Sequence, residues 1–250
     1  MYFSKKIKKF KKIKHCFFSK KGGFSNGLYK SLNCGEGSLD KKKNIRKNLT
    51  FVSKKMGIKR SNLILMYQTH SNKVIEVKKN KFRKKIRSDA IITRDKKIAL
   101  GVVTADCVPV LLCDAKNEMV GCIHAGWKGA LKGIIKNTVS KIRKNNKYGK
   151  IFACIGPCIG RKNYEVGLKF YRKFMSKSNK NKLYFSFKNK NKKLFNLRKF
   201  VKDKLEELNV SVDHVNHDTY KERNNFFSYR RSIILKEKDY GRCISVIRLV

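Results

Sequence analysis

Short apolar runs rich in β-branched residues follow one another closely through the central third of this 250-residue chain. Residues 98–104, 108–113, 119–123 and 151–155 form such runs, with turn-forming residues between them, and they predict buried strands. Residues 130–143 and 197–208 instead repeat apolar side chains at helical spacing, and residues 243–249 predict a closing strand. Strands and helices mixed without strict alternation predict an α+β (mixed α/β) fold, with mixed sheets flanked by helices.

No internal repeat and no Gly/Ser/Pro linker divides the chain, so we expect a single domain over residues 1–250. The basic segment 1–14 is expected to be mobile. Three further lysine-rich segments, 41–47, 78–85 and 176–193, are interpreted as loops or solvated faces. The last of them is the best candidate for a mobile surface excursion, and residues 183–187 inside it are a strand candidate.

The sequence predicts a cytoplasmic protein with no membrane partner. It contains no run of about 18 apolar residues that could span a bilayer, and its basic start lacks the apolar centre of a signal peptide. In a reducing compartment the eight cysteines are expected to be thiols or ligands rather than disulfides. No Cys-x-x-Cys pair occurs among them, which excludes the usual zinc-finger and thioredoxin patterns.

A net charge of +46 admits two interpretations. A basic protein of this kind can bind nucleic acid or another anionic surface. Lysine can also simply serve wherever a solvated polar residue is needed, and here the lysines are spread along the whole chain rather than gathered in one tail. We favour the second interpretation, and expect only non-specific, salt-sensitive binding of nucleic acid.

Three residues at predicted strand ends offer metal ligands: His70, Cys107 and His124. Each stands beside small or turn-forming residues, where functional sites are commonly built. One thiolate and two imidazoles would hold Zn²⁺ and leave its fourth tetrahedral position open, as catalytic zinc sites do. Their spacing alone matches no zinc-finger pattern, and buried Cys and His residues are often merely packed.

The same residues allow a catalytic site without a metal. Cys107 could be a nucleophile and His124 its base, as in cysteine hydrolases such as amidases. The second imidazole separates the two hypotheses, because a dyad needs one histidine whereas an open zinc site uses both His70 and His124.

Other residues near these positions could contact a substrate. Lys128 opens the predicted helix after His124, where free N–H groups favour an anion, although an ordinary tight turn would look the same. Trp127, the single tryptophan, could stack on an aromatic base or fill the core. Asp106 could orient a ligand, move protons or cap a turn. Asp89, which precedes an apolar run beginning at Ala90 and Ile91, has the same ambiguity.

A second group of residues is a candidate for anion binding. Residues 226–231 combine aromatic side chains with two arginines, and an arginine such as Arg230 binds phosphate or carboxylate through two parallel hydrogen bonds. By composition this stretch could equally contact RNA, which leaves a basic RNA-associated protein as a further alternative.

Taken together, these phrases resemble the laccase-domain family, also called YfiH-like proteins or multicopper polyphenol oxidoreductases and now regarded as purine nucleoside phosphorylases. The resemblance spans nearly the whole chain. It is carried by residues 17–25, 31–35, 68–71, 104–109, 124–129, 155–159, 164–167, 226–231 and 241–242.

The resemblance implies that His70, Cys107 and His124 bind a catalytic Zn²⁺, with copper the less favoured metal. It also implies phosphorolysis of adenosine, inosine, guanosine and methylthioadenosine to the free base and ribose 1-phosphate, with adenosine deamination as a side activity. The expected partners are therefore purine nucleosides and phosphate, and the protein is expected to be a monomer or homodimer. For anion contact we favour Lys128, Arg230 and Arg46.

For hydrogen bonding to the substrate we favour Asp106 or Gln68. The chain departs from the family pattern at four positions, with Lys20 and Lys128 in place of Arg, Asn196 in place of Asp, and Asp218 in place of Cys. Lysine cannot supply the planar fork of arginine, so the first two changes affect anion recognition. The five histidines are too few for the sites of a usual multicopper oxidase, and the H-x-E/P-C-x-x-C deaminase signature is absent.

Overall fold

The computed structural model describes residues 1–78, 86–114, 119–144 and 149–250. The expectation for 78–85 therefore lies almost entirely outside the described residues. Within them no helix is long and apolar enough to cross a bilayer. The helices are α1 (Lys42–Met56), α2 (Trp127–Leu131), α3 (Ile134–Arg143), α4 (Leu168–Met175), α5 (Leu197–Glu206) and α6 (Tyr229–Ile234).

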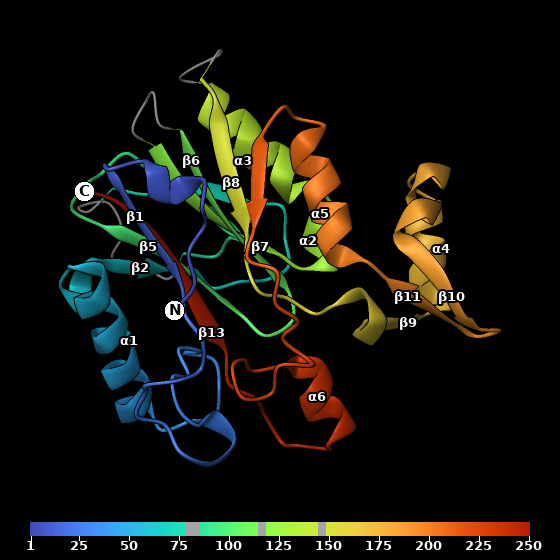
Figure 1. Cartoon of the computed structure of the whole chain (residues 1–250), viewed down its shortest axis with the longest axis horizontal. Coiled ribbons are helices and arrows are strands. Elements are labelled where there is room, and N and C mark those ends of the chain that lie inside the picture. Colours follow the sequence, from blue (N-terminus) through green and yellow to red (C-terminus); the bar gives the residue numbers. More distant parts are fainter. Residues whose placement is uncertain (79–85, 115–118, 145–148) are drawn as a thin grey trace.

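A six-stranded mixed sheet forms the centre of the molecule (Figure 1). Its order is β12-β8-β6-β7-β4-β3, with parallel pairs at both edges and antiparallel pairs between. The bounds are β3 (Val74–Glu76), β4 (Ala90–Thr93), β6 (Val108–Asp114), β7 (Met119–Ala125), β8 (Ile151–Ile155) and β12 (Ser211–His214). Because β6 and β7 are buried on both faces, they read as continuous apolar runs, and the sequence predicted both.

A second sheet packs against one face of the first. It has the order β1-β13-β5-β2, with β1 (Ile13–Phe17), β2 (Leu63–Leu65), β5 (Ala99–Thr104) and β13 (Cys243–Leu249). Buried apolar side chains from both sheets, including Leu100, Val102, Leu111, Val120 and Ile247, form the layer between them. The strands predicted at 98–104 and 243–249 are thereby confirmed, and so is the α+β class with mixed sheets.

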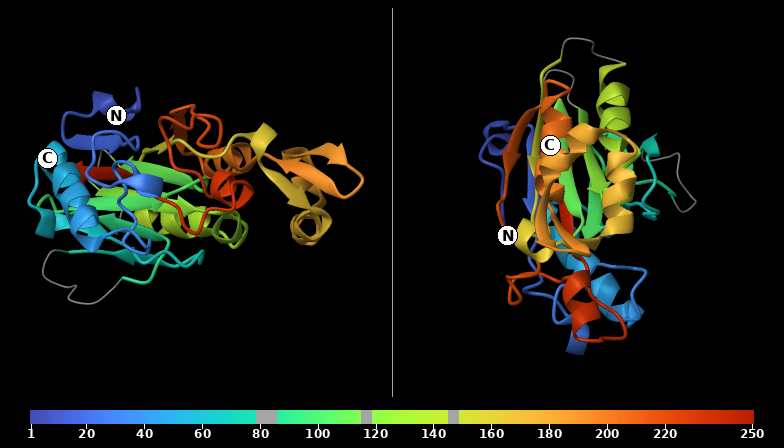
Figure 2. Two further views of the ribbon diagram at one scale, coloured as in Figure 1. Left: turned by 90° about the horizontal axis from the view of Figure 1, so that it is seen from below. Right: turned by 90° about the vertical axis from the view of Figure 1, so that its right-hand side faces the viewer.

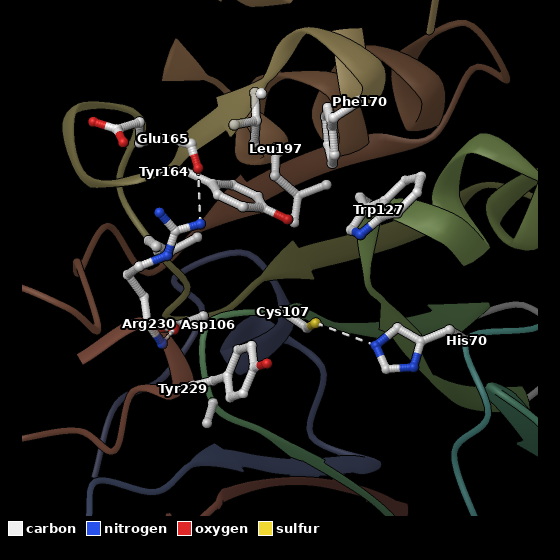
Figure 3. Close-up of a pocket in the computed structure, with 14 residues that line it drawn as sticks. His70, Asp106, Cys107, Trp127, Tyr164, Glu165, Phe170, Leu197, Tyr229 and Arg230 are labelled. Atoms are coloured by element: carbon white, nitrogen blue, oxygen red, sulfur yellow. Dashed lines mark hydrogen bonds between the residues drawn. The ribbon is translucent and has the colours of Figure 1, made fainter. Parts of the chain in front are cut away.

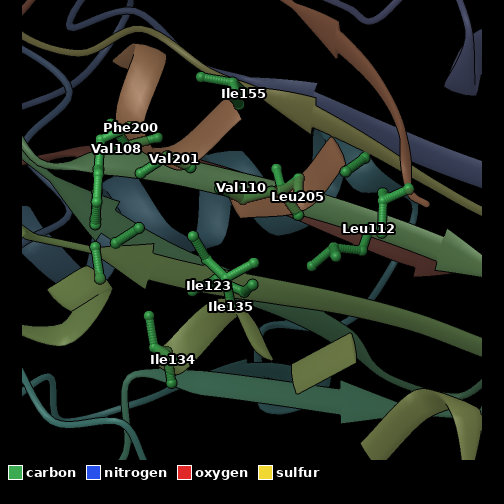
Figure 4. Close-up of a cluster of buried hydrophobic side chains, with 14 of the residues drawn as sticks. Val108, Val110, Leu112, Ile123, Ile134, Ile135, Ile155, Phe200, Val201 and Leu205 are labelled. Carbon is green, nitrogen blue, oxygen red and sulfur yellow. The ribbon is translucent and has the colours of Figure 1, made fainter. Parts of the chain in front are cut away.

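Helices cover the outer faces of the two sheets. On the six-stranded sheet, α3 and α5 pack Ile134, Ile135, Val201 and Leu205 against apolar side chains of the strands (Figure 4). On the four-stranded sheet, α1 buries its apolar positions, which recur at helical spacing between lysines. For the segment 41–47 this helix confirms a solvated face and excludes a loop: its lysines are exposed, and from Lys42 the backbone is helical.

The expected helix over 130–143 is interrupted. It consists of α2 and α3, which are separated at Gly133, where φ is +90°. Glycine adopts this left-handed conformation without the steric cost that a Cβ imposes. The first of the two helices, α2, begins at Trp127, three residues earlier than predicted, and follows closely on the end of β7.

A small lobe extends from the body on the side where α5 begins (Figures 1 and 2). It contains α4 and a three-stranded sheet with the order β10-β11-β9, formed by β9 (Glu165–Gly167), β10 (Phe185–Asn189) and β11 (Lys192–Phe195). Stacked and edge-on rings of Phe170, Phe174, Phe185 and Phe195 form its core. The strand candidate at 183–187 thus lies in this lobe, displaced to Phe185–Asn189.

The N-terminal segment contacts the body of the protein. The amide of Ser4 donates to Nε2 of His15 at 2.8 Å, and its hydroxyl donates to Asp213 at 2.7 Å. Ile7 is fully buried between the sheets. These contacts place a basic stretch of chain along the outer edge of β12 without burying its lysines.

Candidate metal centre and substrate pocket

Two strand ends and one loop bring the predicted ligands together, so the expected strand end at His70 is corrected to a loop position. Cys107 lies in the corner between β5 and β6, His124 is near the end of β7, and His70 lies in the loop between β2 and β3. Their ligand atoms all lie within 4.8 Å of one another. The Sγ atom of Cys107 is 3.8 Å from Nε2 of His70, and the two imidazole rings meet edge to face with centroids 4.7 Å apart. Antiparallel pairing of β6 with β7 explains why residues distant in sequence meet here.

Asp89, which precedes β4, holds both imidazole ligands. Its Oδ1 contacts Nδ1 of His124 at 2.8 Å and accepts a hydrogen bond from the amide of His70 at 2.9 Å. Its Oδ2 accepts from the amide and hydroxyl of Ser71 at 2.6 and 2.7 Å. His70 adopts a left-handed φ of +57°, which is rare outside glycine, and these hydrogen bonds hold it there.

The close contacts between Cys107, His124 and Asp89 shift the pKa values of all three side chains. Burial opposes ionisation of Cys107, but the neighbouring His124 and His70 outweigh it and lower the pKa of the thiol. Burial likewise opposes a charged His124, but the thiolate and the Asp89 carboxylate raise its pKa. The hydrogen bonds from His124 and Ser71 lower the pKa of Asp89 against the effect of burial. The Cys107 thiolate and the Asp89 carboxylate therefore both interact with the His124 imidazole, and both favour positive charge there.

The three donors fit a metal ion. One thiolate and two imidazoles converge, and the other ring nitrogen of His124 contacts a carboxylate, the arrangement that fixes the tautomer of a metal-bound histidine. Gly126 lets the chain pass close behind the ligands, because a Cβ at this position would lie 2.6 Å from the His70 ring and 3.1 Å from the Cys107 sulfur. Three protein ligands leave a coordination position for a substrate or water.

Asp106 supports the neighbouring helix rather than the metal ligands. Its buried carboxylate accepts hydrogen bonds from the amide of Arg230 at 2.6 Å, from Thr219 at 2.7 Å and from Ser228 at 2.9 Å. Its φ is +82°, so the corner before Cys107 is strained and held by these contacts. The carboxylate thereby fixes the start of α6, which carries Arg230.

A pocket of about 390 Å³ opens above the ligands (Figure 3). His70 and Cys107 lie at its floor, and the lobe contributes much of the opposite wall. Its larger side chains are mostly aromatic or apolar, with a single guanidinium at one side: Trp127, Tyr164, Phe170, Leu197, Tyr229 and Arg230. Such a pocket suits a planar aromatic ligand that carries a polar or anionic group.

The predicted substrate-binding residues separate into two groups. Trp127 and Arg230 line the pocket, but Gln68, Lys128 and Arg46 are not among the lining residues. The amide of Gln68 is bonded to the backbone of β5 in both directions, at 2.8 and 3.0 Å. Lys128 is exposed on α2, with its ammonium 5.6 Å from the Trp127 ring, and Arg46 is exposed on α1.

The sequence-based selection of site residues missed Tyr164, Phe170, Leu197 and Tyr229. Phe170 and Leu197 have no polar atom to mark them, and they reach the pocket from α4 of the lobe and from the start of α5. Tyr164 lies in the segment 164–167, one of those that carry the family resemblance, but nothing in the sequence indicated that its side chain lines the pocket. Tyr229 directly precedes Arg230, and α6 turns both toward the pocket (Figure 3).

Fold and site together define a class: α+β proteins of two packed sheets, in which strand ends present an open Cys/His metal site to an aromatic pocket. The chain belongs to the family described as multi-copper polyphenol oxidoreductase laccase, which it matches over residues 14–250. This confirms the resemblance drawn from the sequence phrases.

Named relatives agree with this assignment. The chain is 33% identical to the purine nucleoside phosphorylase of Haemophilus influenzae, covering 93% of each protein. It is 31% identical to the purine nucleoside phosphorylase YfiH of Escherichia coli, covering 96% of this chain and 95% of the relative. Among solved structures, a Neisseria meningitidis protein of family DUF152 is 30% identical with a TM-score of 0.86, covering 96% and 95%. The Bacillus licheniformis protein YfiH is 26% identical with a TM-score of 0.87, covering 95% and 93%.

Proposed function

We propose that this protein is a zinc-dependent purine nucleoside phosphorylase that cleaves adenosine, inosine, guanosine and methylthioadenosine. The observation that carries the proposal is the aromatic pocket directly above three convergent soft and borderline ligands. Its agreement with relatives named purine nucleoside phosphorylase supports the substrate class.

Zinc is the metal that best suits this donor set. A thiolate and two imidazoles in a closed triangle are typical ligands for tetrahedral Zn²⁺, and three protein ligands are typical of catalytic sites. The five histidines of the chain cannot furnish the sites of a usual multicopper oxidase, although the family name carries that label. Zinc held by His70, Cys107 and His124 would supply a positive charge that polarises or positions an oxygen atom in the pocket.

The remaining groups of the pocket have roles in the proposed reaction. Trp127 and Phe170 can hold a purine ring, since their own rings lie with centroids 4.6 Å apart along one wall. Arg230 donates one hydrogen bond to the backbone carbonyl of Glu165 at 2.8 Å, which fixes a guanidinium with further donors at the side of the pocket. We assign those donors to phosphate. A phosphate oxygen then forms a bond to ribose C1′ as the C1′–N9 bond breaks, and the electron pair of the C1′–N9 bond moves into the purine.

Adenosine deamination is the second activity that we propose for this site. It would use water instead of phosphate and exchange the amino group at C6 for oxygen, releasing ammonia. The zinc-deaminase sequence signature is absent, so the activity would depend on a differently built site. Measuring inosine and ammonia formed from adenosine in phosphate-free buffer tests it separately.

The decisive experiment combines metal analysis with a nucleoside assay. We expect the purified protein to hold about one zinc per chain and to release free purine only when phosphate is present. C107A should lose both zinc and turnover. C113A, in which a buried cysteine of β6 away from the site is replaced, is the matched control and should keep both. Full activity of zinc-free C107A would contradict the proposal.

Two other functions predict different outcomes. A metal-free cysteine hydrolase is favoured by the lowered pKa of the Cys107 thiol beside His124. It would lose activity on alkylation of Cys107 and be indifferent to chelators. A basic RNA-associated protein, suggested by the net charge, would bind RNA through residues 226–231 and release no purine.

A further inference from the structure

The Tyr164 side chain places a hydroxyl group in the pocket. Its ring is half-buried in the pocket wall, and its hydroxyl points into the space above Cys107, across from the indole of Trp127 (Figure 3). Within the described part of the chain this hydroxyl makes no hydrogen bond. A hydroxyl directed at an open cavity can donate a hydrogen bond to a ligand there.

The position of this hydroxyl is fixed by packing. The Tyr164 ring meets the rings of Phe195 and Phe170 edge-on, with centroids 5.7 and 6.1 Å apart. The guanidinium of Arg230 lies 5.6 Å from the centre of its ring. The backbone carbonyl of Tyr164 also accepts a hydrogen bond from the amide of Phe195 at 2.9 Å. A donor held from several sides needs little reorganisation when a ligand binds.

Its chemical state is that of a donor. Burial raises the pKa of the Tyr164 phenol, and the negative charge at Cys107 raises it further, while Arg230 opposes them only partly. The hydroxyl therefore stays protonated at physiological pH. A group in this state can stabilise developing negative charge by a hydrogen bond but does not act as a base.

We propose that the Tyr164 hydroxyl donates a hydrogen bond to the purine as it leaves, which makes Tyr164 a catalytic residue. The inference rests on the proposed phosphorolysis. As phosphate oxygen bonds to C1′ and the C1′–N9 bond breaks, the electron pair of that bond becomes negative charge on the purine. Tyr164 stabilises this charge and keeps its own proton, and the purine takes a proton from water as it leaves the pocket.

The test uses Y164F with two substrates. Phenylalanine removes only the hydroxyl, so kcat for inosine should fall about 10- to 100-fold, the loss expected for one hydrogen bond to a charged group. 7-Methylinosine carries a fixed positive charge on its base, which leaves as a neutral molecule and gains little from the hydroxyl. The kcat for 7-methylinosine should therefore stay within about threefold of wild type, which also demonstrates that the variant is folded and its site intact.

Tyr171→Phe is the matched control. Tyr171 lies on α4 of the same lobe, packs on Phe185 with centroids 5.0 Å apart and does not line the pocket. Y171F should match wild type on both substrates. Equal kcat of Y164F and wild type on inosine would overturn the inference, and so would equal losses on both substrates, which indicate a structural role. A wild-type protein without phosphorolysis would instead refute the proposed function itself.

Discussion

The exchange of Asp89 for Asn probes the geometry of the metal site without touching a ligand. The carboxylate lies between donors on both sides: Nδ1 of His124 and the amide of His70 on one oxygen, and the amide and hydroxyl of Ser71 on the other. An amide keeps one acceptor oxygen and replaces the other with an NH₂ group. Whichever way the side chain turns, an NH₂ donor then faces a backbone N–H donor, at His70 or at Ser71.

The magnitude follows from these contacts. Hydrogen bonds to a charged group contribute about 1.5–3 kcal/mol each, and at least one is replaced by a donor–donor contact in D89N. Loss of the partner of a metal-bound histidine typically weakens metal binding about 10- to 100-fold. We therefore expect the zinc dissociation constant of D89N to rise by about 10- to 100-fold, because His124 loses its orientation and His70 its strained backbone conformation.

Competition with a chromophoric chelator measures this constant directly. Asp40→Asn is the matched control, since Asp40 is also a buried carboxylate that accepts two hydrogen bonds, from Ser25 at 2.6 Å and Asn33 at 3.0 Å, but touches neither histidine. D40N should lose stability and keep its zinc affinity. If D89N bound zinc within a factor of two of wild type, the positioning role of Asp89 would be refuted.

Three further predictions test other features. G126A should weaken zinc binding, because its Cβ would lie 2.6 Å from the His70 ring; chelator competition measures this, and unchanged affinity would contradict it. Burial lowers the pKa of His15 from 6.5 to about 4, so the unfolded chain binds the extra proton as the pH falls through this range. Between pH 6.5 and about 4 the free energy of unfolding should fall by up to about 3 kcal/mol. In urea titrations H15Q, whose side chain can still accept a hydrogen bond from the Ser4 amide, should lack this pH-dependent loss. Finally, the +46 charge predicts RNA binding that disappears steeply with salt in fluorescence titrations, and salt-independent affinity would refute a purely electrostatic origin.

The strands of the core were predictable because burial on both faces demands continuous β-branched runs. The pairing register of β4, β6 and β7, which brings the site residues together, could not be predicted from the sequence. Asp89 could not be chosen over a simple cap, since only the pairing of β4 with β7 places it beside His124. The lysines of α1 obscured a helix whose buried positions are few, and Gly133 divided a helical pattern that periodicity alone presents as continuous.

The candidate metal ligands could be selected from the sequence for a different reason. His70, Cys107 and His124 carry recognisable chemistry in the sequence, whereas most of the opposite wall is apolar. Phe170 and Leu197 become site residues only because α4 of the lobe and the start of α5 pack beside the pocket. Contacts between remote segments determine such walls, and no local pattern encodes them.

The candidate metal ligands and part of the pocket wall lie in different parts of the protein. The three candidate ligands and their supporting carboxylate belong to the strands and loops of the central body, while Phe170 lies on α4 of the small lobe and Tyr164 directly precedes its strand β9. Changes in the lobe can alter which base is accepted without disturbing the metal. In directed evolution, a library confined to residues 164–195 should therefore change substrate preference while metal content stays constant.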